Sequence, residues 1–345
     1  MSLTQNKALP TIGLIAVTAV WGSTFFLLKD LVQQMPPLDF LGVRFGLAGL
    51  LIAIFQFGRL RKASRGDWIR GSILAAIYAG GQLLQTIGLQ YTDASISGFI
   101  TGMYLAFTPI LLAILFKQKV SGRAWMAVGI ATVGLGFLSL QGFAFGFGES
   151  VTLVSAVFYA LHIVFLARWA HRSDPVTLGA IQLVGMGVIF SVTALPSGVV
   201  LPSTPGAWAS LLYMAVISGL AAMMVQTWAQ SKLSATTAAV IMSFEPVFAA
   251  FFAILFGGEQ LTVRLLVGGS LILGAMLLIE SGGSSEAKEL PEESLPQPEE
   301  APLGILALDI ESRYALCQSP SYPRSDREPG FSRSERDSAG RVRAA

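Results

Sequence analysis

The sequence carries a single acid in the middle of a long apolar segment. Glu245 lies within AAVIMSFEPVFAAFF, residues 238–252, and Pro246 follows it directly. If this segment crosses a membrane, an ionised carboxylate there costs about 2.5–3.5 kcal/mol on insertion scales, so the acid must be neutral, be paired or border water. Three interpretations remain: a protonated acid at a helix kink, an ion pair with Arg44, and a group that binds a substrate amine or carries a proton. We favour the third.

Polar side chains also recur at helical spacing in other apolar segments. They form stripes of Tyr78, Gln82, Gln85 and Thr86, of Ser97, Thr101, Tyr104 and Thr108, of Ser155, Tyr159 and His162, and of Ser218 and Gln226. A polar side chain that faces lipid is costly, so these stripes should face inward. They either join neighbouring helices, at about 0.6 kcal/mol for each bond, or line a cavity. Their recurrence at equivalent places in both halves favours the cavity.

Trp21 lies in the middle of the first apolar segment, and its equivalent in the second half is Tyr159. Such a tryptophan is either packed core or a surface for the apolar part of a ligand. The residues that would let helices bend, approach or slide are Gly80, Gly81, Gly98, Gly102, Pro109 and Pro246. Pro246 should free a backbone carbonyl near Met242 and kink its helix there.

The chain offers little for catalysis or metal chemistry. It has no HExxH, CxxC or GxSxG motif and one cysteine, Cys317. A zinc site needs at least three suitably spaced ligands, and a serine nucleophile needs a strained turn to present it. We therefore expect no catalytic residues, no metal and no cofactor.

Composition indicates the elements that position these residues. The 345 residues are 53% hydrophobic and 13% charged, with a mean hydropathy of +0.63, whereas soluble domains carry about 25% charged residues. Apolar runs of about 20 residues are typical of transmembrane helices. We predict ten, at residues 9–31, 38–57, 68–89, 94–116, 123–141, 149–170, 176–195, 207–229, 234–256 and 263–281.

The distribution of Lys and Arg predicts the orientation of these helices. One set of helix ends carries twelve basic residues: Lys7, Arg59, Arg61, Lys62, Arg65, Arg70, Lys117, Lys119, Arg123, Arg168, Arg172 and Lys232. The alternate set carries Lys29 and Arg264. Because basic residues concentrate on the cytoplasmic side, both termini should be cytoplasmic. The chain should therefore be a multi-pass membrane protein.

The apolar body repeats internally. An offset of 140 places Tyr78 on Ser218, Gly129 on Gly269 and Gly134 on Gly274, and an offset of 138 places Trp21 on Tyr159. A repeat of five helices must insert in the opposite sense the second time, as in many secondary transporters. We predict an all-α membrane protein with repeat 1 at residues 1–141, repeat 2 at 142–282 and a disordered cytoplasmic tail at 283–345, rich in Gly, Ser, Pro and Glu.

Four short motifs resemble those of the drug/metabolite transporter superfamily, EamA type, over residues 10–280. They are Trp21-Gly22-Ser23, Arg44-Phe45, Glu245-Pro246-Val247 and Gly258-Glu259-Gln260-Leu261-Thr262. The sequence is similar in particular to bacterial inner-membrane exporters of aromatic amino acids, a resemblance that implies a multi-pass protein of the bacterial inner membrane. The resemblance implies alternating access through a central cavity lined by the first, third, fourth, sixth, eighth and ninth helices. Repeat 1 departs from the family pattern, with Lys119 where repeat 2 has Glu259.

These observations predict an exporter of small amphipathic metabolites, above all aromatic or hydrophobic amino acids. The expected substrate-binding residues are Trp21, Ser23, Tyr78, Gln82, Thr101, Tyr104, Tyr159, His162, Ser243 and Glu245. The alternatives are a drug or sugar-phosphate carrier, for which Arg44 alone is thin support, and an intramembrane enzyme or a passive scaffold. We expect a monomer that contacts the lipid bilayer and a small-molecule substrate but no nucleic acid.

Overall fold

The structure, a computed structural model, describes residues 8–117, 121–141, 144–169, 173–230 and 241–286. Several residues used above lie outside the described ranges, among them Lys119, Lys232 and nearly all of the predicted tail. The domain boundaries at 141, 282 and 345 stay predictions.

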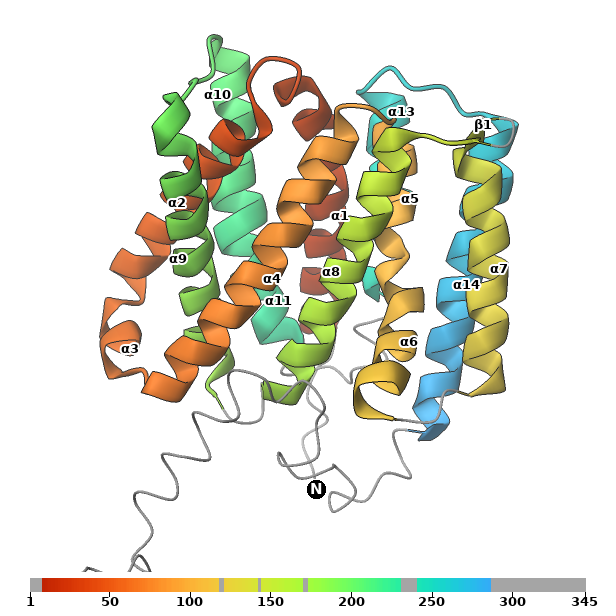
Figure 1. The fold of residues 1–345 in the computed structure, drawn as a ribbon, viewed down its shortest axis with the longest axis horizontal. Helices are drawn as coiled ribbons and strands as arrows, with labels where there is room; N and C mark the ends of the chain where they lie inside the picture. The colour runs from red at the N-terminus through yellow and green to blue at the C-terminus, as the bar shows by residue number, and fades with distance from the viewer. Residues whose placement is uncertain (1–7, 118–120, 142–143, 170–172, 231–240, 287–345) are drawn as a thin grey trace, which may run out of the picture. The chain divides into compact units, whose positions relative to one another are not determined.

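The described residues are almost entirely helical (Figure 1). The helices are α1 (Ala8–Leu31), α2 (Pro37–Phe55), α3 (Phe57–Lys62), α4 (Arg65–Leu89), α5 (Ala94–Gly102), α6 (Tyr104–Phe116), α7 (Gly122–Ser139), α8 (Phe147–Trp169), α9 (Pro175–Ala194), the 3-10 turn η2 (Leu195–Ser197), α10 (Pro205–Leu212), the π-helical segment η3 (Tyr213–Ala221), α11 (Ala222–Gln230), α13 (Glu245–Leu255) and α14 (Val263–Glu286). A short antiparallel pair, β1 (Leu140–Gln141) and β2 (Ala144–Phe145), connects α7 to α8.

Seven stretches in the described part of the chain are long and apolar enough to cross a membrane: Ala8–Leu31, Pro37–Phe55, Arg65–Leu89, Ala94–Phe116, Phe147–Leu166, Pro175–Ala194 and Pro205–Gln226. Three shorter apolar helices follow the same pattern, at Gly122–Leu138, Glu245–Leu255 and Val263–Leu278. Large apolar side chains such as Leu50, Ile54 and Val192 are exposed on the outer surface, which suits contact with lipid. The count of ten spans stays a prediction.

Several helices begin where the sequence offers a capping side chain or a proline. Ser64 accepts a hydrogen bond from the backbone N–H of Asp67, and Asp67 accepts one from Ser64 in return. This reciprocal pair satisfies two helix N–H groups that would otherwise lack partners. Pro37, Pro175 and Pro205 each stand in the first turn of their helices, where proline's missing N–H costs nothing.

Two of the predicted spans contain a turn, at positions that the predicted offset relates. The predicted fourth span changes from α5 to α6 at Met103, and the described part of the predicted ninth span passes through a turn at Ser243 and Phe244 before α13 begins at Glu245. The offset of 140 places Met103 on Ser243. Pro109 lies inside α6, six residues after Met103, and its role in bending this helix stays a prediction. The turn at Met103 directly follows Gly102, whose helix propensity is low.

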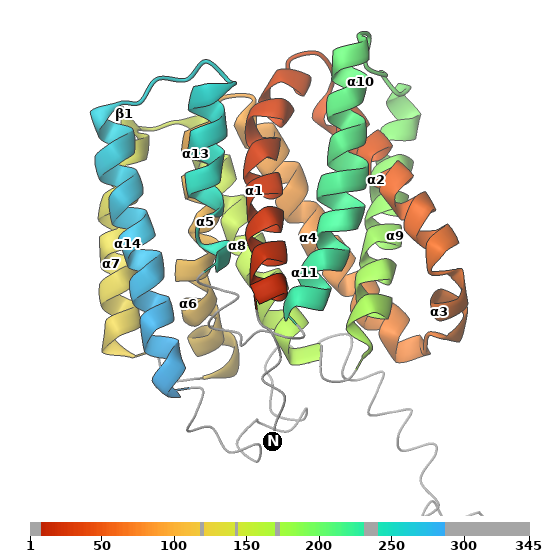
Figure 2. The same cartoon turned by 180° about the vertical axis from the view of Figure 1, so that it is seen from behind.

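The most extensive helix contacts join one helix from residues 1–141 to one from residues 142–282. They pair α2 with α9, α7 with α14, α4 with α8, α4 with α9, α1 with α13, and α5 with α13. Figures 1 and 2 show α2 beside α9 at one edge and α7 beside α14 at the other. Figure 2 shows α1 between α13 and the α10–α11 segment. The two halves of the body are therefore packed against each other along their lengths.

Gly22 sets the distance between α1 and α13. A Cβ atom at this position would lie 2.5 Å from Cβ of Phe248 and 2.8 Å from the backbone nitrogen of Ala249. Gly22→Val should therefore overpack the interface, at a cost of about 1–3 kcal/mol. A Cβ at Gly274, in α14, would meet nothing within 4 Å, so Gly274→Ala is the control. We expect thermal unfolding in detergent to show a lower Tm for Gly22→Val alone, and equal Tm values would contradict this.

Candidate substrate-binding site

A chain of buried polar side chains crosses the interior between α2, α4, α5 and α8. Nη1 of Arg44 donates to Oε1 of Gln82 at 3.4 Å, and Nε2 of Gln82 donates to the hydroxyl of Tyr159 at 2.7 Å. The Tyr159 hydroxyl donates to Oε1 of Gln85 at 2.8 Å, and Nε2 of Gln85 donates to Oγ1 of Thr101 at 3.0 Å. All five side chains are buried. This series of hydrogen-bonded side chains brings donors and acceptors together at one place inside an otherwise apolar body.

Two aromatic groups extend this polar chain. The Tyr78 ring lies 5.2 Å from the Tyr159 ring and 4.8 Å from the His162 ring, between centroids. His162 is buried, and its Nε2 lies 2.6 Å from Oε1 of Gln182 on α9. This contact gives His162 a structural partner. Tyr78 is only half-buried, so it is the member of this group with accessible surface.

A second aromatic contact, between α1 and η3, resembles the one between Tyr159 and α4. Nε1 of Trp21 donates to the carbonyl oxygen of Ser218 at 3.0 Å, and Ser23 lies 2.8 Å from the Tyr213 hydroxyl, between oxygens. Tyr213 and Ser218 belong to the π-helical segment, a form that often marks functional sites. The predicted offset of 138 places Trp21 on Tyr159. The polar tip of Trp21 bonds η3, and that of Tyr159 bonds α4.

Glu245 begins α13 and is half-buried. It lies close enough to Tyr78 and Tyr159 for its charge to act on both hydroxyls, and the charge of Arg44 acts on the same two. No ion pair joins Glu245 to Arg44 among the described residues. The structure therefore does not support an ion pair between Glu245 and Arg44. Instead, two tyrosines lie within reach of both opposite charges.

The remaining predicted residues pack around this group. Tyr104 belongs to the same apolar cluster as Tyr159, and Ser243 is buried at the interruption that precedes Glu245. A Cβ atom at Gly81 would lie 3.0 Å from the Tyr159 ring, and one at Gly98 would lie 2.6 Å from Cβ of Ala249. Gly80 faces Phe158, and Gly102 faces Met276 and Pro246. These glycines thus lie where helices of different repeats come close.

Sequence reasoning omitted three residues from the candidate site: Arg44, Gln85 and Gln182. Gln85 belongs to a predicted polar stripe, but the spacing of a stripe does not indicate which of its residues bonds a second helix. Gln182 could have been found through the repeat, because the offset of 138 places it on Arg44. Each bonds a polar side chain of a neighbouring helix: Arg44 bonds Gln82, and Gln182 bonds His162.

At one end of α4, the carboxylate of Glu259 caps α5, a helix far from it in the sequence. Asp93 is the N-cap residue of α5 but makes no side-chain capping bond, because its carboxylate pairs with Lys29 at 2.8 Å. Glu259 supplies the cap instead, accepting from the backbone nitrogens of Ala94 at 2.6 Å and Ser95 at 3.2 Å. Lys29 Nζ also lies 3.7 Å from Glu259 Oε1. This end is held by charged contacts across the repeats.

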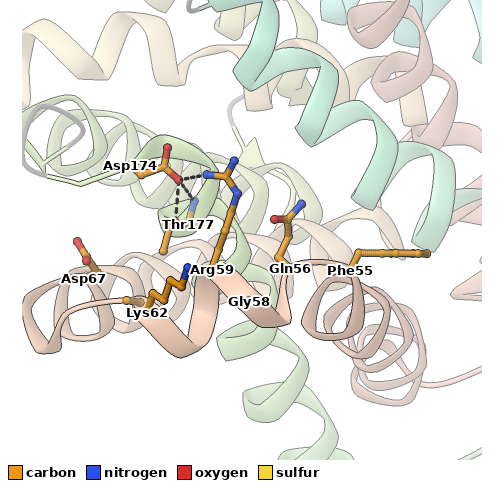
Figure 3. A pocket seen from close by; sticks show the side chains of 9 residues that line it. Phe55, Gln56, Gly58, Arg59, Lys62, Asp67, Asp174 and Thr177 are labelled. Carbon is orange, nitrogen blue, oxygen red and sulfur yellow. Dashed lines mark hydrogen bonds and ion pairs between the residues drawn. The ribbon is translucent and has the colours of Figure 1, made fainter.

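The other end of α4 carries a hollow of about 560 Å³ lined by residues of α2, α3, α4 and α9 (Figure 3). Arg59 pairs with Asp174 there at 3.0 Å. Partial burial pushes the pKa of Asp174 upward, but hydrogen bonds from Thr177 and the Arg59 charge outweigh it and hold the pKa below its usual value. The resulting stabilisation is present at neutral pH and is lost only as the pH falls through that lowered pKa, below about 4. The hollow is separate from the buried polar chain.

The family of this chain follows from a comparison over its apolar body. The model of the EamA-like transporter family matches twice, at residues 9–140 and 146–281. The chain belongs to the EamA-like transporter family. Its two matches cover the regions expected for the two repeats, and this EamA-like protein is a membrane transporter of the drug/metabolite transporter superfamily.

Relatives of this EamA-like transporter agree with that assignment. An uncharacterized transporter of Archaeoglobus fulgidus is 31% identical over 269 residues, covering 78% of this chain and 84% of the relative. An uncharacterized inner membrane transporter of Escherichia coli, YedA, is 26% identical, covering 80% of this chain and 92% of the relative. A crystal structure matches with a TM-score of 0.57 at 15% identity, covering 81% of this chain and 99% of the matched one, and shows the fold alone.

Proposed function

We propose that this EamA-like transporter exports small amphipathic metabolites, and aromatic or hydrophobic amino acids in particular, from the cytoplasm of a bacterial cell across its inner membrane. The observation that carries the proposal is the half-buried carboxyl group of Glu245, which is within electrostatic range of Tyr78 and Tyr159 in the apolar body. A carboxylate suits an ammonium group, and aromatic rings with polar tips suit an apolar side chain that carries one.

The arrangement of the helices supports alternating access between two inverted repeats. The extensive contacts pair helices of opposite repeats, and both central spans, the fourth and the ninth, are interrupted at equivalent residues. Broken helices near the midplane are where inverted-repeat transporters hold substrate. In this proposal the two halves rock about Met103 and Ser243, exposing the group around Glu245 to one side at a time.

Efflux from proteoliposomes tests the proposal. The full chain is reconstituted, the vesicles are loaded with radiolabelled amino acids of different side chains, and efflux is followed with and without a pH gradient. We expect protein-dependent efflux of phenylalanine, tryptophan or leucine above that of aspartate and lysine. The proposed substrate class would be refuted if no amino acid left the proteoliposomes faster than it leaves loaded liposomes that contain no protein.

Trp21 should discriminate between substrates by the size of their side chains. Trp21→Ala removes the ring and the bond to Ser218, whereas Trp21→Phe retains an aromatic surface and removes only the bond. We expect Trp21→Ala to slow tryptophan efflux severalfold more than threonine efflux, and Trp21→Phe to retain most of this discrimination. Equal slowing of both substrates by Trp21→Ala would assign Trp21 to packing.

A further inference from the structure

Arg44 is a buried cation that forms no ion pair with any residue in the described part of the chain. Its side chain is 7% exposed, and no carboxylate of the described residues lies within ion-pair distance of it. Asp39, on the same helix, uses its carboxylate to accept from the backbone nitrogen of Val200 at 3.0 Å. Burying an uncompensated charge costs several kcal/mol, so the retained guanidinium needs a reason other than an internal ion pair.

The donors of Arg44 are incompletely used. A guanidinium has five N–H groups in a planar fork. Nη1 makes a long bond of 3.4 Å to Gln82, and Nε is buried without a hydrogen-bond partner. The rings of Phe45 and Phe40 lie 4.9 and 5.8 Å from the guanidinium carbon. Aromatic contacts of this kind fix the position of the plane while leaving its edge donors available.

The surroundings of Arg44 place it in the candidate site and opposite in charge to Glu245. It bonds Gln82, the first member of the polar chain, and its charge acts on Tyr78 and Tyr159. Glu245 acts on the same two tyrosines from α13. The group around Tyr78 and Tyr159 therefore has two poles within electrostatic range: the guanidinium of Arg44 on α2 and the carboxyl group of Glu245 on α13.

We propose that Arg44 binds the carboxylate of the transported substrate, which makes the substrate a zwitterion rather than a cation. This rests on the proposed function, because it assigns the second pole of the same site. The α2 helix, which was not among the expected cavity-lining helices, then contributes to recognition. Arg binds a carboxylate through two parallel N–H···O bonds, a geometry that the single ammonium of Lys does not reproduce.

Three probes that share a phenyl ring separate the two poles. Phenylalanine carries both charges, 3-phenylpropionate carries only the carboxylate, and 2-phenylethylamine carries only the ammonium. Equilibrium binding is measured by calorimetry on the full chain in nanodiscs. We expect Arg44→Gln to weaken binding of the first two by about tenfold or more and to leave 2-phenylethylamine unchanged. Glu245→Gln should give the opposite selectivity between the two single-charge probes.

Two further variants keep a purely structural role distinguishable. Arg44→Lys preserves the positive charge, and we expect it to recover part of the affinity for 3-phenylpropionate. If Arg44→Gln does not fold, the affinities of Arg44→Lys for the three probes are compared with those of the wild type instead. Asp39→Asn alters a buried polar group of the same helix that bonds only a loop backbone, and it should leave all three affinities unchanged even if the Tm falls.

The outcomes separate this inference from the proposed function. Binding of 3-phenylpropionate that depends on Arg44, without efflux of any amino acid, would keep Arg44 as a carboxylate site and reject amino-acid export. Amino-acid efflux with affinities for both carboxylate probes unchanged in Arg44→Gln would keep export and reject the carboxylate site. The inference also fails if all three probes weaken alike in Arg44→Gln, or if wild-type protein binds no carboxylate probe.

Discussion

Replacing Glu245 by Gln should slow efflux of amino acids by about tenfold or more while leaving the protein folded in the membrane. A charge-assisted hydrogen bond between carboxylate and ammonium contributes about 1.5–3 kcal/mol, and each 1.4 kcal/mol is tenfold in affinity. Gln keeps the size of the side chain and the polar atoms but cannot carry the negative charge. The loss should therefore fall on substrate recognition.

The fold should tolerate this change because Glu245 makes no ion pair with any residue that the structure describes. The loss of a negative charge from the first turn of α13 costs about 0.3–1 kcal/mol, which is small for a chain of this size. Efflux from proteoliposomes and the Tm in detergent are measured together. Asp30→Asn, which changes an exposed acid at the end of α1, is the control. Wild-type efflux in Glu245→Gln would leave the acid without a role in transport.

Much of the fold could be predicted because hydropathy reports directly on the apolar spans. The predicted spans at 38–57 and 176–195 differ from α2 and α9 by at most two residues at each end. The sequence did not predict the turn of the fourth span at Met103, because Pro109 is the stronger local signal for a bend in this segment. The observed break at Met103 follows Gly102, which packs against Met276 and Pro246. Such a tertiary contact is not visible from local propensity.

The sequence predicted which residues belong to the candidate site better than it predicted the hydrogen bonds that join them. Periodicity placed Gln82, Thr101 and Tyr159 on inward faces, and the structure connects all three through hydrogen bonds. Periodicity could not show that His162 is held by Gln182, nor that Arg44 and Glu245 do not pair. Those features depend on the rotation of α2, α9 and α13 about their axes, which hydropathy leaves open.

The two ends of the helical body are held by different contacts, and this difference makes Glu259 informative. At the α5 end, the Glu259 carboxylate accepts from two helix N–H groups of the opposite repeat and lies near Lys29. The offset of 140 places Lys119 on Glu259, and an ammonium can only donate hydrogen bonds, so it cannot replace a carboxylate as a helix N-cap. At the other end of α4, Arg59 pairs with Asp174.

Glu259→Ala should therefore loosen one end of the body. It leaves the N–H groups of Ala94 and Ser95 without their acceptor, which costs about 1–3 kcal/mol. We expect a Tm lower by several degrees, at about 2–4 °C per kcal/mol, and altered efflux, because the lost bonds join segments of different repeats. Gln260→Ala changes an exposed neighbour and should behave like the wild type.

Labelling shows whether the loss of this cap opens a path to the candidate site. In a chain with Cys317 replaced by Ser, Ser97→Cys places a thiol at a buried position of α5, one turn before Thr101. If the Glu259 cap closes this end, a membrane-impermeant maleimide should modify that thiol several times faster in Glu259→Ala than in Gln260→Ala. A contact that closes a path must slow a reagent that uses this path. Equal labelling rates together with equal Tm values would therefore show that the Glu259 cap neither stabilises the fold nor closes this end.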